Sequence, residues 1–130
     1  MMEDIFIKEA PTTPEVKFFF QKGHLEIKGV SIPEDTEEFY LPILEALEEY
    51  LKMYSPKEIT VVFKLIYVNT STSAVLGKII KMLEPIEGEE RIVNIHWYYE
   101  MEDEDMKDLG EDFNSFSKLN FEMFPCEEII

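Results

Sequence analysis

The apolar run at residues 59–68 constrains the fold more than any other part of the sequence. Its side chains are β-branched, aromatic or aliphatic on both alternating faces, with Thr60 and Lys64 as the exceptions. A run of this kind is typical of a central strand in a parallel sheet that is covered on both faces. Parallel neighbours are joined by crossovers of a dozen residues or more, usually helices. The sequence therefore predicts an α/β fold with helices before and after this strand.

Strand and helix patterns alternate along the rest of the chain. The predicted strands are residues 16–20, 24–28, 59–68, 91–99 and 121–124, and the predicted helices are a segment ending before Ser55, residues 74–83 and residues 103–118. Asp35 or Thr36 can cap the first helix, although Pro42 favours an irregular or later start. After a leading arm at residues 1–14, the order is ββαβαβαβ in a single domain over residues 1–130. The first two strands form an antiparallel hairpin, and the helices pack on a mixed sheet.

Composition argues against several classes of partner. The formal net charge of −16 argues against nucleic acid and against anionic membranes, because both attract basic surfaces. Apolar residues make up 45% of the chain, which is enough for a core, and no run reaches the roughly 18 apolar residues of a membrane span. Cys126 is the single cysteine, and the acidic N-terminus does not resemble a signal peptide. We therefore expect a cytoplasmic protein without an internal disulfide.

A row of polar residues, Asn69-Thr70-Ser71-Thr72-Ser73, follows the apolar run and precedes the second predicted helix. Oxygens of Asn, Ser and Thr side chains satisfy the free N–H groups at a helix start. One such residue is enough for a cap, so a plain cap and a modified hydroxyl are both open interpretations. A helix start tolerates negative charge, and a phosphate here would add roughly −1.5 to −2 charges while keeping the fold.

Two other segments are candidates for contact with a partner protein. Ser31-Ile32-Pro33-Glu34 lies in a predicted loop at residues 29–34, which is either a plain connection or a contact loop that exposes apolar surface. His96-Trp97-Tyr98-Tyr99 lies in a predicted strand, so its side chains point alternately to two faces. We expect Trp97 in the core, and His96 with Tyr98 on the opposite side, where aromatic surface favours an interface.

The sequence offers little for catalysis. The acidic run Glu100, Glu102, Asp103, Glu104, Asp105 lacks the pattern of an EF-hand loop, and we expect a solvated helix start. Neither His24 nor His96 lies near Cys126 in sequence to activate its thiol. No phosphate-binding glycine loop, zinc motif or hydrolase motif is present. We predict no enzyme activity, no cofactor and no metal site. The alternatives are a metal-binding protein or enzyme that uses the carboxylates near Asp103, or a constitutive interaction module.

Three segments together resemble a known family. They are Gly29-Val30-Ser31-Ile32-Pro33-Glu34 leading into Phe39-Tyr40-Leu41-Pro42, then Leu65-Ile66-Tyr67-Val68-Asn69-Thr70-Ser71, and then His96-Trp97-Tyr98-Tyr99 before an acidic helix that contains methionine. Their order and spacing resemble the SiaC-type bacterial regulatory phosphoproteins over residues 13–124. The resemblance implies a fold similar to the STAS domains of anti-sigma-factor antagonists.

The resemblance also implies a partner-switching function. In this family a dedicated kinase phosphorylates the threonine of the Asn-Thr-Ser motif, and a PP2C-type phosphatase removes the phosphate. The unmodified form binds a downstream signalling protein, for which a diguanylate cyclase is the known type. On this sequence the resemblance implies Thr70 as the acceptor, with Ser71 as the alternative; Thr72 stands where other members have a second serine. We expect the partner-binding residues to be Ser31, Pro33, Glu34, Asn69, Ser71, Thr72, Ser73 and Tyr98.

Overall fold

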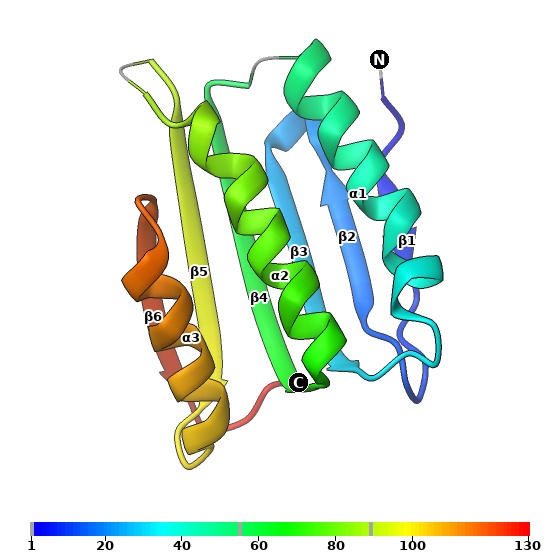
Figure 1. Ribbon diagram of the computed structural model, residues 1–130, viewed down its shortest axis with the longest axis vertical. Coiled ribbons are helices and arrows are strands. Elements are labelled where there is room, and N and C mark those ends of the chain that lie inside the picture. The colour runs from blue at the N-terminus through cyan, green and yellow to red at the C-terminus, as the bar shows by residue number, and fades with distance from the viewer. Residues whose placement is uncertain (1, 55, 89) are drawn as a thin grey trace.

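The chain folds into one six-stranded sheet with three α-helices, shown as a computed structural model in Figure 1. The structure describes residues 2–54, 56–88 and 90–130. The elements are β1 (Ile5–Ile7), β2 (Glu15–Phe19), η1 (Phe20–Lys22), β3 (His24–Ser31), α1 (Thr36–Met53), β4 (Glu58–Val68), α2 (Thr70–Leu83), η2 (Glu84–Ile86), β5 (Ile92–Glu100), α3 (Glu104–Phe116) and β6 (Asn120–Cys126). The predicted α/β class with a mixed sheet is confirmed. Residues Met1 and Ser55, which the sequence predicts in the arm and at the helix stop, lie outside the described residues.

The strands lie in the sheet in the same order as in the chain. β1, β2 and β3 pair antiparallel, and β3, β4, β5 and β6 pair parallel. Each parallel step goes in the same direction across the sheet, and right-handed crossovers then place every connecting helix on the same face. Figure 1 shows α1, α2 and α3 side by side on that face.

This topology corrects the prediction that helices cover both faces of residues 59–68. Val61, Phe63 and Leu65 point to the helices and are buried. Lys64 lies on the open face, where Ile66 is 38% exposed. The two polar residues of the run, Thr60 and Lys64, both lie on this open face, but Val62 and Ile66 on the same face are apolar, and they made the run resemble a strand covered on both faces.

Side chains rather than helices shield the open face of the parallel strands. The Tyr98 and Phe124 rings stack with centroids 4.8 Å apart, and the Lys64 ammonium lies 5.1 Å from the Tyr98 ring centroid. Glu26 adds a hydrogen bond of 3.2 Å with His24 and an ion pair of 3.9 Å with Lys64. Long and aromatic side chains thus cover backbone that a second helical layer would otherwise bury.

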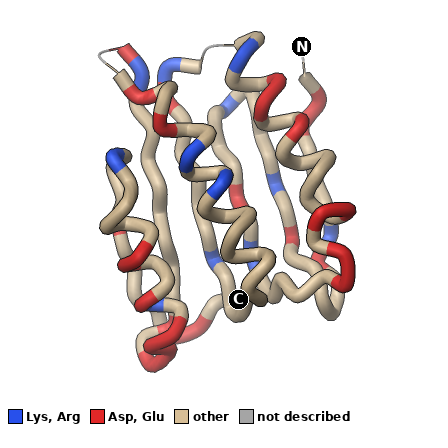
Figure 2. The backbone as a smooth tube through the Cα atoms, viewed as in Figure 1, with Lys and Arg blue, Asp and Glu red and all other residues tan. Residues whose placement is uncertain are grey.

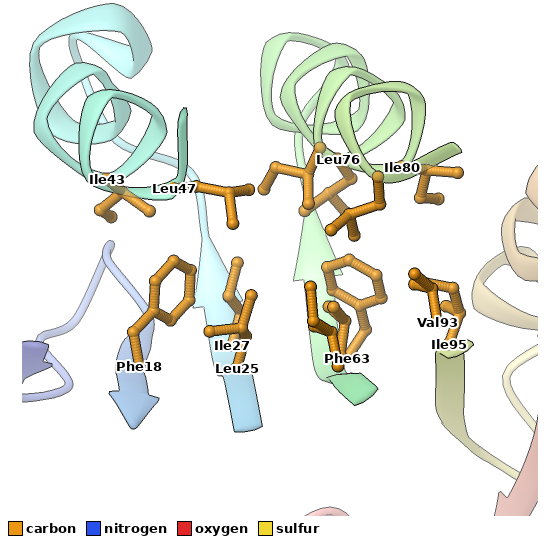
Figure 3. Close-up of a cluster of buried hydrophobic side chains, with 14 of the residues drawn as sticks. Phe18, Leu25, Ile27, Ile43, Leu47, Phe63, Leu76, Ile80, Val93 and Ile95 are labelled. Atoms are coloured by element: carbon orange, nitrogen blue, oxygen red, sulfur yellow. The ribbon is translucent and has the colours of Figure 1, made fainter. Parts of the chain in front are cut away.

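The core lies between the helices and the sheet. Figure 3 shows Phe18, Leu25 and Phe63 from the strands facing Leu47 and Leu76 from the helices. These side chains are almost completely buried. Full burial of such a side chain contributes about 1.5–3 kcal/mol each, so this layer supplies most of the stabilising free energy.

Trp97 fixes α3 to the sheet. The predicted alternation along β5 is confirmed, because Trp97 and Tyr99 are buried while His96 and Tyr98 are only partly so. The Trp97 Nε1–H donates a hydrogen bond of 2.9 Å to the Met106 carbonyl of α3. Gly110 lets the helix approach, since a Cβ there would lie 2.5 Å from the Trp97 ring.

Several element boundaries differ from the prediction. β1 lies inside the predicted arm, and β3 continues through Gly29 to Ser31 where a loop was expected. α1 begins at Thr36 despite Pro42, which is exposed, so that water can satisfy the carbonyl that proline leaves unpaired. Among the described residues, none of the helices has the length and apolar character needed to cross a membrane.

Candidate functional site

The predicted hydroxyl cluster lies where the carboxyl ends of two parallel strands meet. β3 ends at Ser31 and β4 ends at Val68, and these two residues are register partners. The Asn69 N–H donates to the Ser31 carbonyl over 3.1 Å, so the two strand ends remain joined beyond the ladder. Carboxyl ends of neighbouring parallel strands are a frequent place for functional sites in α/β folds.

The hydroxyls form the first turn of α2 instead of a junction before it. The helix begins at Thr70, four residues earlier than the predicted start at residue 74. Asn69 is the N-cap, and its Oδ1 accepts a hydrogen bond of 2.8 Å from the Thr72 N–H. The cap requirement is therefore met by Asn69, which leaves the hydroxyls free for other roles.

One of these hydroxyls, that of Thr72, belongs to a buried network with Ser31 and Tyr40. Tyr40 Oη lies 2.7 Å from Ser31 Oγ, and Ser31 Oγ lies 2.9 Å from Thr72 Oγ1. Thr72 Oγ1 donates to the Ser31 carbonyl over 3.2 Å. This last bond uses the Thr72 hydroxyl hydrogen, so Ser31 must be the donor in its bond with Thr72. The Ser31 hydrogen is then used as well, so Tyr40 must be the donor in its bond with Ser31. Ser31 and Thr72 are fully buried, so the network ties β3, α1 and α2 together from within.

Burial sets the protonation of this network. It raises the pKa of Tyr40 to about 12, while hydrogen bonding with the Ser31 and Thr72 hydroxyls acts in the opposite direction. The phenol therefore remains neutral and able to donate at physiological pH. Every buried side-chain nitrogen and oxygen in the described part of the chain has a hydrogen-bond partner.

A second, exposed chain of hydrogen bonds lies above the buried one. Thr36 Oγ1 donates to Ser71 Oγ over 3.0 Å, and Ser71 Oγ donates to Asn69 Oδ1 over 3.4 Å. This chain joins the start of α1 to the start of α2. Thr70 stands outside both chains. Its side chain is exposed at the first helical position, and its hydroxyl makes no hydrogen bond with the described residues.

The structure separates the residues that the sequence predicts as partner contacts. Ser31 and Thr72 are fully buried, so in this conformation they support the surface from beneath, and Pro33 is also buried but lines a surface hollow beside Glu34. Tyr98 lies on the open face of the sheet, away from the helices. The predicted contacts that stay at least partly accessible at the site are Glu34, Asn69, Ser71 and Ser73.

Thr36 and Tyr40 belong to this site although neither of them was assigned to it from the sequence. Tyr40 follows the apolar spacing of α1 and is typical of a core residue, and Thr36 indicates only a possible cap. Both lie about 30 or more positions from the hydroxyl cluster of α2 in sequence, so only the fold brings their hydroxyls together. No local pattern could have found them.

The other candidates take structural roles. Asp103 caps α3, with its carboxylate accepting from the Met106 N–H over 3.1 Å. No group of three or more His, Cys, Asp or Glu residues in the described ranges is arranged to hold a metal ion. Burial, followed by the charge of Glu100, raises the pKa of the Cys126 thiol, which lowers its nucleophilic character.

A model of the SiaC family regulatory phosphoproteins matches residues 7–126. This chain belongs to the SiaC family. The family resemblance drawn from three sequence segments is thereby confirmed. A protein of Pseudomonas aeruginosa strain UCBPP-PA14 is 28% identical over 120 residues, which are 92% of this chain and 94% of that protein.

Solved structures of SiaC from Pseudomonas aeruginosa share the fold at 25% sequence identity. One superimposes with a TM-score of 0.87 and covers 96% of this chain and 100% of that one. The apo form gives a TM-score of 0.84 and covers 95% of this chain and 99% of that one. A third is SiaC as the activator bound to the diguanylate cyclase SiaD, with a TM-score of 0.87 over 95% of this chain and all of that one.

Proposed function

We propose that this SiaC family member is a partner-switching regulator controlled by reversible phosphorylation of Thr70. A protein kinase adds the phosphate and a PP2C-type phosphatase removes it. The unmodified form binds a diguanylate cyclase, as the Pseudomonas aeruginosa SiaC does with SiaD. The protein itself is non-enzymatic and acts in the cytoplasm.

The observation that carries this proposal is that the Thr70 hydroxyl stands apart from both hydrogen-bonded chains. Thr70 is exposed at the first position of α2, and neither hydrogen-bonded chain depends on it. The first turn of α2 contains no acidic side chain that would repel a phosphate. The N-terminal end of a helix favours negative charge by about 0.3–1 kcal/mol. A phosphate at Thr70 is therefore compatible with the folded state.

The same phosphate opposes a packed protein interface. It adds roughly −1.5 to −2 charges and three strong acceptor oxygens, which lose their hydration if a partner covers them. Ser71 is the alternative acceptor, but its hydroxyl is engaged with Thr36 and Asn69. Modification of Ser71 would break these bonds, so we favour Thr70.

The experiment compares three full-length variants in the native host. Thr70→Asp should lose capture of the diguanylate cyclase by about tenfold or more, while its circular dichroism spectrum and melting temperature match the parent. Thr12→Asp, which places the same charge on the exposed arm, should bind like the parent. Thr70→Ala should bind but lack the phosphate that peptide mapping finds in the parent.

A constitutive interaction module makes the opposite prediction. Its surface would include Tyr98, which is only partly buried on the open face of the sheet. Under that function Thr70→Asp would bind as the parent does, and Tyr98→Ala would not. Equal binding of the parent and Thr70→Asp would overturn the phosphorylation switch.

A further inference from the structure

The exposed side of α2 is bordered by an apolar groove on each flank. The outward residues Ser71, Ala74, Lys78 and Lys81 follow helical spacing and form a ridge. We call this ridge with its two grooves the helical docking face. All three helices contribute to it, and it lies on the side of the sheet seen in Figure 1.

The groove between α2 and α3 is the larger of the two, at about 550 Å³. Phe113 and Phe116 line one side, and Gly77 and Ile80 line the other. Phe113 is anchored, because its ring meets Trp97 edge-on with centroids 5.6 Å apart. Phe116 is 80% exposed at the end of α3. An aromatic side chain so exposed beside an apolar groove is the kind of residue that anchors protein interfaces.

The groove between α1 and α2 holds about 340 Å³ and continues the same surface. Leu41, Leu44 and Val75 supply its apolar lining, and Leu41 is 47% exposed. Ala74 and Lys78 line both grooves, so the two are adjacent across the ridge. Ser71 lines this second groove, which therefore reaches the turn that carries Thr70.

The charge of the ridge differs from that of the whole molecule. The chain carries −16, yet Lys78 and Lys81 are the charged residues of the ridge, and Glu84 lies at the far end of the larger groove. Figure 2 shows blue segments on α2 and red segments on the neighbouring helices. Complementarity at this face therefore calls for carboxylates above α2.

We propose that the helical docking face binds an amphipathic α-helix of the partner protein, with its apolar ridge against Phe116 and Leu41 and its carboxylates over Lys78 and Lys81. Helix-in-groove recognition uses an apolar face of this shape, and charged residues at its edge fix the orientation. The inference rests on the proposed function for the existence of a protein partner. It adds where that partner lies and what chemistry it presents.

This placement explains how one hydroxyl can control binding. Thr70 and Lys81 are 11 residues apart, so the ridge extends about 16 Å along the helix axis from the acceptor. A helix lying along this ridge therefore reaches Thr70. A phosphate there places roughly −1.5 to −2 charges against the same carboxylates that the lysines attract.

Site-specific photocrosslinking in the native host tests the docking face whichever protein the partner is. The photoreactive analogue p-benzoylphenylalanine replaces Phe116 in the full chain, and it replaces Phe6 in a matched control. Phe6 is 62% exposed on the edge strand β1, so both sites tolerate the change without loss of the fold. Crosslinked peptides are then identified by mass spectrometry. A second pair adds Lys78→Glu or, as the control, Lys57→Glu to the chain with the label at 116.

We expect position 116 to crosslink to a partner segment with apolar residues at helical spacing flanked by Asp or Glu, and position 6 not to do so. Lys78→Glu should lower the yield by about tenfold and Lys57→Glu should leave it unchanged.

No crosslink at 116, equal yields at 116 and 6, or a crosslink to a basic or extended segment would overturn the docking face. An acidic helix from a protein other than a diguanylate cyclase would support the docking face and refute the proposed partner. Capture of a diguanylate cyclase without a crosslink at 116 would support the proposed partner and refute the docking face.

Discussion

Thr70 and Thr72 illustrate how two neighbouring threonines in one helical turn acquire different roles. Thr72 points inward and closes the hydrogen-bonded network of Ser31 and Tyr40. Thr70 points to solvent and supports nothing else in the described structure. Thr72 thus carries the structural role, and the proposed phosphorylation of Thr70 leaves this network intact.

Substitution of each threonine by valine tests this division. In Thr72→Val the Ser31 hydroxyl loses its acceptor inside the core, and we expect a loss of about 1–3 kcal/mol in the free energy of unfolding. Thr70→Val changes only an exposed side chain and should stay within about 0.5 kcal/mol of the parent. Urea unfolding measures both. Equal effects from the two substitutions would contradict the assignment.

Alkaline pH should weaken the fold through Tyr40. Its pKa is raised from 10.0 in the unfolded chain to about 12 in the fold, so the neutral phenol stabilises the folded state fully below pH 10. That contribution is lost as pH rises from 10 towards 12, and its full size is about 3 kcal/mol. The unfolding free energy of the parent should therefore fall by about 3 kcal/mol relative to that of Tyr40→Phe over this window. A difference independent of pH would show that Tyr40 titrates normally.

At the scale of elements, the packing of α3 requires a glycine at position 110, whereas α2 has room for a larger residue at Gly77. Gly110 leaves no room for a Cβ, which would lie 2.5 Å from Trp97 Cδ1. At Gly77 a Cβ would contact Phe113 at 3.4 Å, an ordinary van der Waals distance. Helix geometry is the same at both positions, so the environment decides the effect of an added methyl group.

We predict opposite signs for alanine at these two glycines. Gly110→Ala should lower the free energy of unfolding by about 1–3 kcal/mol, because Trp97 must move. Gly77→Ala should raise it by up to about 1 kcal/mol through higher helix propensity. Thermal or urea unfolding decides between them. A stabilised Gly110→Ala variant would contradict the packing of α3 on Trp97.

Elements with strong periodicity were predictable from the sequence, and those set by long-range contacts were not. The apolar spacing of α1 and the alternation around Trp97 led to correct assignments. β1 is only three residues long and so carries no alternating pattern of its own. The start of α2 was placed too late because Thr and Ser have modest helix propensity, while Asn69 acts as the cap. The order of strands, which leaves one face open, is fixed only when the strands pair.

At the scale of the whole molecule, charge is the dominant feature. A net charge of −16 is spread over a small domain, and among the described residues the carboxylates far outnumber the lysines that pair with them. Self-repulsion of this kind disfavours the compact state and keeps copies of the protein apart. The ridge of α2, with its two lysines, interrupts this acidic surface at the place where we propose that a partner lies.

Added salt should therefore stabilise the protein. Between about 0.01 M and about 1 M ionic strength the screening length falls from about 30 Å to about 3 Å, so the repulsion among carboxylates weakens. The melting temperature, followed by circular dichroism in sodium chloride, should rise over this range. A melting temperature that falls with salt would mean that attractive ion pairs outweigh the repulsion.

Phosphate occupancy at Thr70 in two cellular pools tests the central claim most directly. The protein is purified from its native host, and the fraction bound to its partner is separated from the free fraction by size. Peptide mapping then measures phosphate at Thr70 and at Ser71 in each pool. We predict phosphate at Thr70 in the free pool and almost none in the bound pool. Equal occupancy in the two pools, or phosphate confined to Ser71, would contradict the account.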